Sequence, residues 1–359
     1  MFARNTTFII GAGASCELNL PSGEQLMTDI TELLAPSDQN LYGFADEAFC
    51  KEIQASLASF TEERRAAIAE LQRARDVILA ALPWSPSIDN LLHNHNEDAW
   101  VKRLGKAAIA WCILHAEANS HFFPSLSQAE LFSLAYGDAP LLPRDPQIRG
   151  EELQESWYRP FAQILFSQVR WPDLSNALRN VRFVIFNYDR CFEHFLFHAI
   201  QDQYNVDPKL AAEVLGNTTF VHPYGTLGPL PWQFHIDDPK LGLGDLKNAP
   251  SIFSVGSNLK TFTESLDSHT VDTVKTHVGM AATLIFLGFG FLKQNIELIR
   301  PYERSATQIY ATAYGLSEPN KDAAKSILSS FLDRLSVEPF IEGGRCSSLF
   351  SNYRMKLAA

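Results

Sequence analysis

The sequence has few cysteines, and none of them is paired with another nearby. The five lie far apart along the chain, at Cys16, Cys50, Cys112, Cys191 and Cys346, and no CxxC motif occurs. An odd number of scattered cysteines argues against a disulfide framework, and the missing pairs argue against a zinc ribbon. We therefore expect a protein of a reducing compartment that binds no metal.

Long apolar runs and an excess of positive charge are also missing. The run Phe8-Ile9-Ile10 is too short for a signal peptide, and no stretch of about 20 apolar residues is present to span a bilayer. Lys and Arg number 30 against 41 Asp and Glu, which gives a net charge of −11. Phosphate backbones and anionic membranes bind clustered Lys and Arg, so we expect a soluble cytoplasmic protein without direct nucleic-acid or membrane contacts.

The chain is long enough to bury a substantial core. It has 359 residues, of which 46% are hydrophobic, so one elaborated domain or two smaller ones are expected. Short apolar runs rich in strand-forming residues occur at 7–10, 181–186, 219–221, 284–287 and 309–312. Because helical stretches separate most of these runs, they indicate a buried parallel sheet covered on both faces.

Residues from about 25 to 175 have mostly helical spacing. Ile68, Leu71 and Ile78 fall near one face of a segment that Pro83 ends. The first strand cannot stand alone and must join the later ones, so we predict one α/β domain with a Rossmann-like parallel sheet, helices on both faces and a large helical insertion. The predicted parts are a core at about 1–30 and 178–320, the insertion at about 31–177, and a C-terminal helix and tail at 321–359.

A glycine loop follows the first strand directly. In Gly11-Ala12-Gly13-Ala14-Ser15, two glycines would let the backbone approach a pyrophosphate, whose charge suits the N-terminus of a following helix. A full dinucleotide fingerprint would have a third glycine where this chain has Cys16. A purely structural glycine turn is therefore the alternative.

Polar residues stand at the ends of two later strands. Asn187 and Asp189 follow the run at 181–186, at the edge of the sheet where ligands bind, and could contact ribose hydroxyls or position a water. Helix capping near Arg190 is the alternative that spacing alone favours. His222 follows the run at 219–221, and a lone histidine among apolar residues is more often structural.

Two further groups have simpler alternatives. Gly288 and Gly290 end the strand at 284–287, where tight backbone packing would also require glycine. Cys191, His194 and His198 share one helix face, as metal ligands would, but neighbouring phenylalanines favour burial against the sheet. We expect no metal there.

Taken in order, these motifs resemble the sirtuin-like family. The glycine loop, the Asn-x-Asp motif, a histidine near a glycine, and a glycine turn followed by Asn295 are most similar to the family's bacterial antiphage branch, whose members hydrolyse NAD. Ser87-Ile88-Asp89 and Leu20-Pro21-Ser22-Gly23 resemble the same branch. The resemblance spans nearly the whole chain, from Gly11 to about Gly315, and implies a single sirtuin-like domain.

The resemblance also implies roles for individual residues. Asn187 matches the catalytic Asn of the family. The family's catalytic His directly precedes the glycine, where this chain has Tyr224; His222 lies two residues earlier, on the same face of an extended segment, and is expected to be the base, with Tyr224 as the alternative. The residues implied to bind NAD are Gly11, Ala12, Gly13, Ser15, Asp189, Tyr224, Gly225, Gly288, Gly290 and Asn295.

The implied activity is hydrolysis of NAD, which is the substrate. Classical sirtuins carry a zinc module built from two Cys pairs, which this chain lacks, and this points from deacylation towards an NAD glycohydrolase that releases nicotinamide and ADP-ribose. Cleavage builds oxocarbenium character on the ribose, and a histidine near its ordinary pKa could accept a proton at neutral pH.

Such an enzyme would act in antiphage defence by depleting NAD, as in abortive infection, and must be held inactive until infection. We expect control by a partner defence protein from the same operon, by a signal nucleotide, or by assembly into a homo-oligomer. The alternatives are a non-catalytic regulatory module that binds NAD or ADP-ribose and, ranked lowest, a protein deacylase without zinc.

Overall fold

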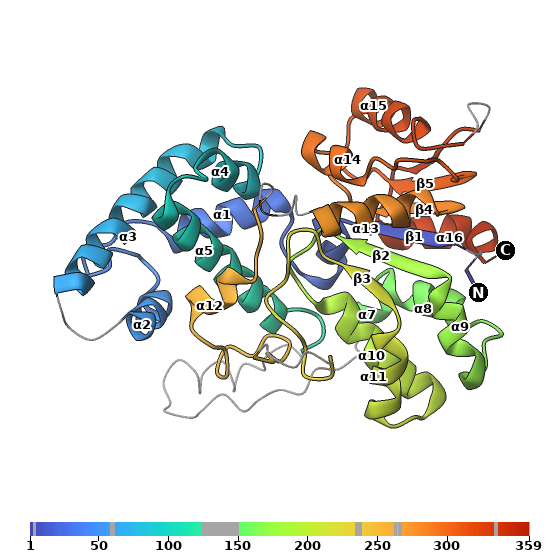
Figure 1. The fold of residues 1–359 in the computed structure, drawn as a ribbon, viewed down its shortest axis with the longest axis horizontal. Coiled ribbons are helices and arrows are strands. Elements are labelled where there is room, and N and C mark those ends of the chain that lie inside the picture. Colours follow the sequence, from blue (N-terminus) through green and yellow to red (C-terminus); the bar gives the residue numbers. More distant parts are fainter. Residues whose placement is uncertain are drawn as a thin grey trace.

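Six parallel strands form one sheet in the order β3-β2-β1-β4-β5-β6 within the described part of the chain (Figure 1). The computed structural model describes residues 1–2, 5–57, 62–123, 151–233, 239–261, 264, 268–333 and 337–358. The strands are β1 (Thr6–Ile10), β2 (Val181–Ile185), β3 (Thr219–Val221), β4 (Thr283–Leu287), β5 (Gln308–Thr312) and β6 (Phe340–Glu342). The strand order reverses direction between β1 and β4, which is the doubly wound Rossmann arrangement, so the predicted fold class is confirmed.

The central strands β1, β2 and β4 are buried on both faces because most of their residues are apolar. All five residues of β1 are buried, and the strand pairs in register with β2 on one side and β4 on the other. Successive side chains point to opposite faces, so Ile9 belongs to one hydrophobic core while Phe8 and Ile10 belong to the other. This two-sided burial is why the runs read as continuous apolar segments rather than alternating ones.

Helices cover each face of the sheet. The core that contains Ile9 is closed by α13 (Ser268–Gly279), α14 (Lys293–Ile299) and α15 (Glu318–Ser329). The core that contains Phe8 is closed by α8 (Tyr158–Phe166), α9 (Leu174–Arg179), α10 (Cys191–Tyr204), α11 (Pro208–Gly216) and α16 (Cys346–Leu357).

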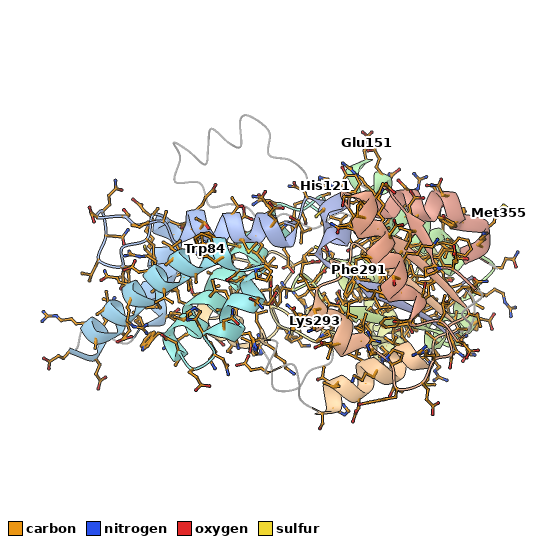
Figure 2. All side chains as sticks on the ribbon, turned by 90° about the horizontal axis from the view of Figure 1, so that it is seen from above. Trp84, His121, Glu151, Phe291, Lys293 and Met355 are labelled. Carbon is orange, nitrogen blue, oxygen red and sulfur yellow. The ribbon has the colours of Figure 1, made fainter. Side chains whose placement is uncertain are left out.

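A helical lobe extends from one end of the sheet (Figure 1). Viewed from above, Trp84 lies on this lobe and Met355 lies at the far end of the sheet region (Figure 2). The lobe consists of α1 (Gly23–Leu33), α2 (Glu47–Ser56), α3 (Glu62–Ala81), α4 (Ile88–Asn94), α5 (Ala99–Ala118) and α12 (Ile252–Ser257).

The helices of 31–177 therefore do not form one continuous insertion. The stretch up to α5 builds the lobe, whereas α7 (Glu151–Glu155), α8 and α9 return to the sheet. The apolar side of α8 explains the return, because Phe161 packs against Phe8 with ring centroids 5.4 Å apart. The lobe also takes α12 from beyond β3, where a Cβ on Gly256 would lie 3.0 Å from the Ala107 backbone nitrogen.

Two local features differ from the sequence expectations. The glycine loop is not followed by a helix but is itself largely part of one, the 3-10 helix Ala12–Leu18. The tail expected after 321 contains β6, which pairs with β5 at the sheet edge; its three residues are only half-buried, so they give little apolar signal. Among the described helices, none is both long and apolar enough to cross a membrane.

Candidate functional site

A cavity of about 620 Å³ opens at the carboxyl edge of the sheet, where the strand order reverses. Ligands of open α/β sheets bind at this position, and the volume lies in the range of small-molecule sites. The helical lobe closes the cavity from the opposite side through α1, α4 and α5. Segments that follow the strands supply the sheet side, at 11–13, 186–189, 224, 288–290, 312–314 and 345–346.

Most of the sequence-predicted residues meet at this cavity. Those that line it are Gly11, Ala12, Gly13, Asn187, Asp189, Tyr224, Gly288, Gly290 and Asn295. Ser15, Gly225 and His222 are not among the lining residues. Ser15 instead hydrogen-bonds Asn187 and Asp189, which do line the cavity. Gly225 lies in a turn with a φ of +71°, where an added Cβ would clash with the Asn258 carbonyl oxygen, so the position requires glycine.

The glycines at the cavity pack backbone against backbone. The Gly11 N–H donates to the Leu287 carbonyl at 2.9 Å, and the Gly13 N–H donates to the Gly288 carbonyl at 3.1 Å. A Cβ on Gly11 would lie 2.5 Å from the Gly288 carbonyl oxygen, and Gly288 itself has a φ of +55°. These N–H groups are thus engaged within the protein, and close packing accounts for Gly11, Gly13 and Gly288 independently of any ligand.

A buried relay of hydrogen bonds holds Asn187. Its Nδ2 donates to the Ser15 Oγ at 2.7 Å, and the Ser15 hydroxyl donates to the Asp189 carboxylate at 2.8 Å. Because the single Ser15 proton is used on Asp189, Asn187 must turn its amide NH₂ to Ser15 and its Oδ1 away. That Oδ1 is buried and has no partner among the described residues, so an acceptor is left for a ligand or water.

The Asp189 carboxyl group is buried and hydrogen-bonded. Burial raises its pKa to about 6, although the Ser15 hydrogen bond opposes the shift and Glu117 adds to it. Its other oxygen accepts the Cys191 N–H at 3.1 Å, so the helix-capping alternative describes part of its role. Asp189 thus accepts the first N–H of α10 and supports Asn187 through Ser15.

A second polar group joins the lobe to the sheet. The Tyr188 hydroxyl donates to the Asp89 carboxylate, and the Tyr224 hydroxyl donates to the Asn295 Oδ1 at 2.6 Å. Ser87 caps α4 by accepting the Asn90 N–H, which fixes the helix start that carries Asp89. Burial raises the pKa of Asp89, while its Tyr188 hydrogen bond opposes the shift. Burial also raises the pKa of Tyr224 far above its ordinary value, so this hydroxyl is a donor rather than a base.

His222 lies behind Asn187 rather than at the cavity. Its Nδ1 lies 3.3 Å from the Asn187 backbone carbonyl, and its Nε2 lies 2.5 Å from a Glu193 carboxylate oxygen. Both ring nitrogens are therefore engaged. Tyr224, the residue weighed against it, is the one that lines the cavity.

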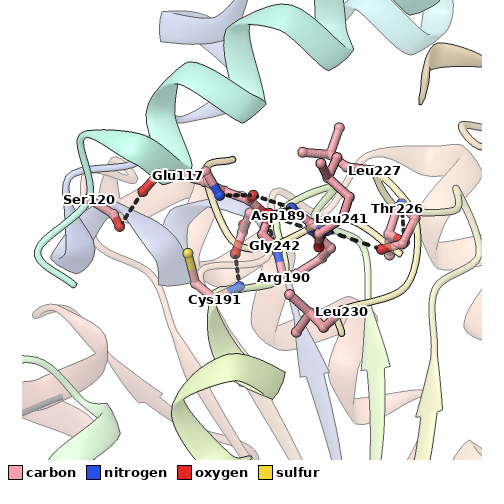
Figure 3. A network of polar contacts seen from close by, with 12 residues as sticks. Glu117, Ser120, Asp189, Arg190, Cys191, Thr226, Leu227, Leu230, Leu241 and Gly242 are labelled. Atoms are coloured by element: carbon pink, nitrogen blue, oxygen red, sulfur yellow. Dashed lines mark hydrogen bonds and ion pairs between the residues drawn. The ribbon is translucent and has the colours of Figure 1, made fainter. Parts of the chain in front are cut away.

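A buried ion pair between Glu117 and Arg190 lies beside Asp189 (Figure 3). Arg190 and Glu117 are 1% and 0% exposed, and their Nη2 and Oε2 atoms lie 2.5 Å apart. Arg190 also donates to the Leu241 carbonyl at 2.7 Å and to the Gly242 carbonyl at 3.1 Å, so the charges are well satisfied. The pair joins the end of α5 to the start of α10. Sequence reasoning missed it because its members are 73 residues apart.

The Cys191, His194 and His198 face is packed inside the protein. The rings of His194 and His198 lie 4.4 Å apart, and His194 meets Phe122 edge-on at 5.3 Å. Burial holds the pKa of His194 well below its ordinary value, so it is neutral. Within the described residues, no group of three His, Cys, Asp or Glu side chains is arranged to hold a metal ion.

Arg345 is a cavity residue that sequence reasoning also missed. Among the described residues that line the cavity, it is the only Lys or Arg, and its guanidinium lies 5.7 Å from the Tyr314 ring centroid. It directly precedes α16 and follows Gly343-Gly344 after β6. The two glycines indicate a turn, but the short strand before them is not predicted from the sequence, so the turn could not be assigned to the edge of the sheet.

Comparisons with known proteins give likenesses among solved structures. No family model matches the sequence, and no curated protein matches it. One similar solved structure is a Sir2 homologue in complex with NAD, at 12% identity and a TM-score of 0.40, covering 98% of this chain and 90% of the other. Another is a triple mutant of Sir2 homologues in complex with 2′-O-acetyl ADP ribose, at 12% identity and a TM-score of 0.38, covering 99% and 93%.

Proposed function

We propose that this protein is an NAD glycohydrolase that binds NAD in the cavity and releases nicotinamide and ADP-ribose. The observation that carries the proposal is the Asn187 side chain. Ser15 and Asp189 fix its orientation, and its buried Oδ1 lacks a partner among the described residues at the crossover point of a Rossmann-like sheet. The sirtuin-like order of motifs supports the same function.

The proposed reaction is substitution at the ribose carbon that bears nicotinamide. The carbon–nitrogen bond breaks, its electron pair leaves with nicotinamide, the oxygen of a water molecule bonds to the carbon, and a proton is released. Positive charge develops on the ribose as the bond breaks. Carboxylates stabilise such charge, and two line the cavity, the half-buried Asp89 and the buried Asp189. The Asn187 Oδ1 would accept a hydrogen bond from the water or a ribose hydroxyl.

The pyrophosphate would lie along Gly11, Ala12 and Gly13. Since the N–H groups of Gly11 and Gly13 are engaged by β4 and the turn after it, positive charge from Arg345 would supply much of the attraction.

In cells, this activity would deplete NAD as the effector step of antiphage defence. A partner protein from the same operon, a signal nucleotide or homo-oligomer assembly would switch it on. The support for this biological role is the resemblance to the antiphage branch.

One observation favours a second candidate, a regulatory module that binds NAD or ADP-ribose without cleaving it. No histidine is present among the described residues that line the cavity, and the Tyr224 hydroxyl is a poor base. Binding without turnover is the outcome that this candidate requires.

The deciding experiment follows nicotinamide and ADP-ribose release from NAD by the purified protein, alone and with the products of neighbouring genes. Release in equal amounts supports the glycohydrolase. Tight NAD or ADP-ribose binding with no release under any of these conditions supports the regulatory module and excludes the enzyme.

A further inference from the structure

His222 stands between two hydrogen-bond acceptors. The Asn187 backbone carbonyl lies 3.3 Å from Nδ1, and a Glu193 carboxylate oxygen lies 2.5 Å from Nε2. Neither a carbonyl nor an ionised carboxylate can donate, so both contacts are satisfied only when both ring nitrogens carry a proton. The side chains of His222 and Glu193 are only 11% and 3% exposed, so water does little to replace these bonds.

The location of this contact gives it a specific use. The β2–β3 ladder ends at the pair Val184 and Val221, one residue before His222. The chain of β2 continues to Asn187 without a further ladder bond from β3. At this position the His222 ring, rather than a backbone N–H group of β3, contacts the Asn187 carbonyl oxygen. Holding this carbonyl restrains the backbone that carries the Asn187 side chain, which donates to Ser15.

The charges around His222 favour its protonated form. Burial disfavours a charge on the ring, but the Glu193 carboxylate, the hydrogen bonds to Glu193 and Asn187, and Asp189 outweigh burial and raise the pKa of His222. Arg190 is the residue before α10, the helix that carries Glu193, and its charge is paired with Glu117. The second Glu193 oxygen is buried and has no partner among the described residues, so Glu193 depends on His222 for compensation.

We propose that Glu193 and His222 form a positioning pair that fixes the Asn187 peptide at the end of β2, with the ring acting as a two-sided donor. The effect of the pair on turnover rests on the proposed function, whereas the contact between the two side chains does not. The pair assigns His222 to positioning rather than to proton abstraction from substrate, and it adds Glu193 to the residues on which turnover depends.

The first test needs no activity. The histidine ring signals of the labelled protein are followed by NMR between about pH 5 and 9, and the His222 signal is identified by its loss in His222→Gln. We expect the pKa of His222 to fall by about one unit or more in Glu193→Gln, which keeps the side-chain volume but removes the charge. Glu213→Gln, at an exposed position on α11, is the matched control. An unchanged His222 titration in Glu193→Gln would overturn the pair.

The second test uses nicotinamide release. In Glu193→Gln we expect kcat to fall about 10- to 100-fold with KM nearly unchanged, as for other residues that orient a reactive group. The competent form has a protonated ring, so activity is lost as pH rises through the His222 pKa. Lowering that pKa moves the alkaline limb of the profile to lower pH.

A base role for His222 predicts the opposite. Activity would then require the neutral ring, and Glu193→Gln would extend activity to lower pH. That result, or an unchanged profile in an active enzyme, contradicts the pair. A wild-type protein that releases no nicotinamide but shows the NMR shift would sink the glycohydrolase and leave the pair standing.

Discussion

At the scale of single residues, the site depends on how buried polar atoms are partnered. Ser15 has one proton to donate, and its use on Asp189 determines which way the Asn187 amide faces. The same reasoning makes His222 a double donor between Asn187 and Glu193. Two hydrogen bonds therefore hold the side chain and the peptide of Asn187, and this is the preorganisation that electrostatic catalysis requires.

The raised pKa of Asp189 predicts a pH dependence of stability. The ordinary pKa is 3.8 and the folded value is about 6, so the folded state binds more protons between these values, and stability falls as pH rises through them. Two pKa units correspond to about 3 kcal/mol.

We expect Asp189→Asn to remove this dependence. Denaturant unfolding at about pH 4 and about pH 7 should show a smaller loss of stability in the variant than in the wild type. Asp322→Asn, at an exposed position on α15, should behave as the wild type does. Equal losses in wild type and Asp189→Asn would contradict the burial-driven shift.

At the scale of elements, close contacts between the ends of β1 and β4 shape the cavity floor. We expect Gly11→Ala to destabilise the protein by about 2 kcal/mol or more, because the added Cβ would lie 2.5 Å from the Gly288 carbonyl oxygen. Gly290 also lines the cavity, but an added Cβ there meets nothing within 4 Å.

Gly290→Ala is therefore the matched control, because it adds the same methyl group at a cavity glycine that has room for it. It should unfold close to the wild-type midpoint, and any effect should appear in NAD binding. If Gly11→Ala proves as stable as Gly290→Ala, the glycines serve the ligand rather than the packing of β1 against β4.

The Arg190–Glu117 pair connects α5, α10 and the segment at 241–242. We expect Arg190→Ala to cost about 3–5 kcal/mol, because it leaves the Glu117 carboxylate buried without its counter-ion. Arg170→Ala removes an exposed pair with Asp173 and should change stability by about 1 kcal/mol or less. Thermal and denaturant unfolding measure both, and similar small effects would show that the buried pair is dispensable.

At the scale of the whole molecule, the sequence predicts the sheet because β1, β2, β4 and β5 are mostly apolar and mostly buried, and β3 is a short apolar run beside β2. It does not predict β6, whose half-buried edge position needs few apolar residues. It also cannot assign α12 to the helical lobe, because that packing rests on contact between Gly256 and Ala107 of α5, which lies 149 positions earlier in the chain.

The sequence predicts those residues of the candidate site that directly follow a strand. It does not predict contacts in the site between residues that lie far apart in the chain. Asn187 is placed at the cavity by its position after a strand and Tyr224 by the family resemblance, but the Ser15 contact to Asp189 spans 174 residues. The placement of His222 beside Tyr224 assumed extended backbone. Instead the Gly225 N–H donates to the His222 carbonyl at 3.1 Å, and this turn separates the directions of the two side chains.

The measurement that tests the proposed chemistry most directly is nicotinamide release at saturating NAD by wild type, Asn187→Ala and Asn176→Ala. Asn176 is exposed on α9 and serves as the control. We predict that Asn187→Ala loses activity by about 100-fold or more while its unfolding midpoint stays close to that of wild type, and that Asn176→Ala keeps full activity. Full activity in a folded Asn187→Ala would contradict the assignment of the chemistry to this cavity.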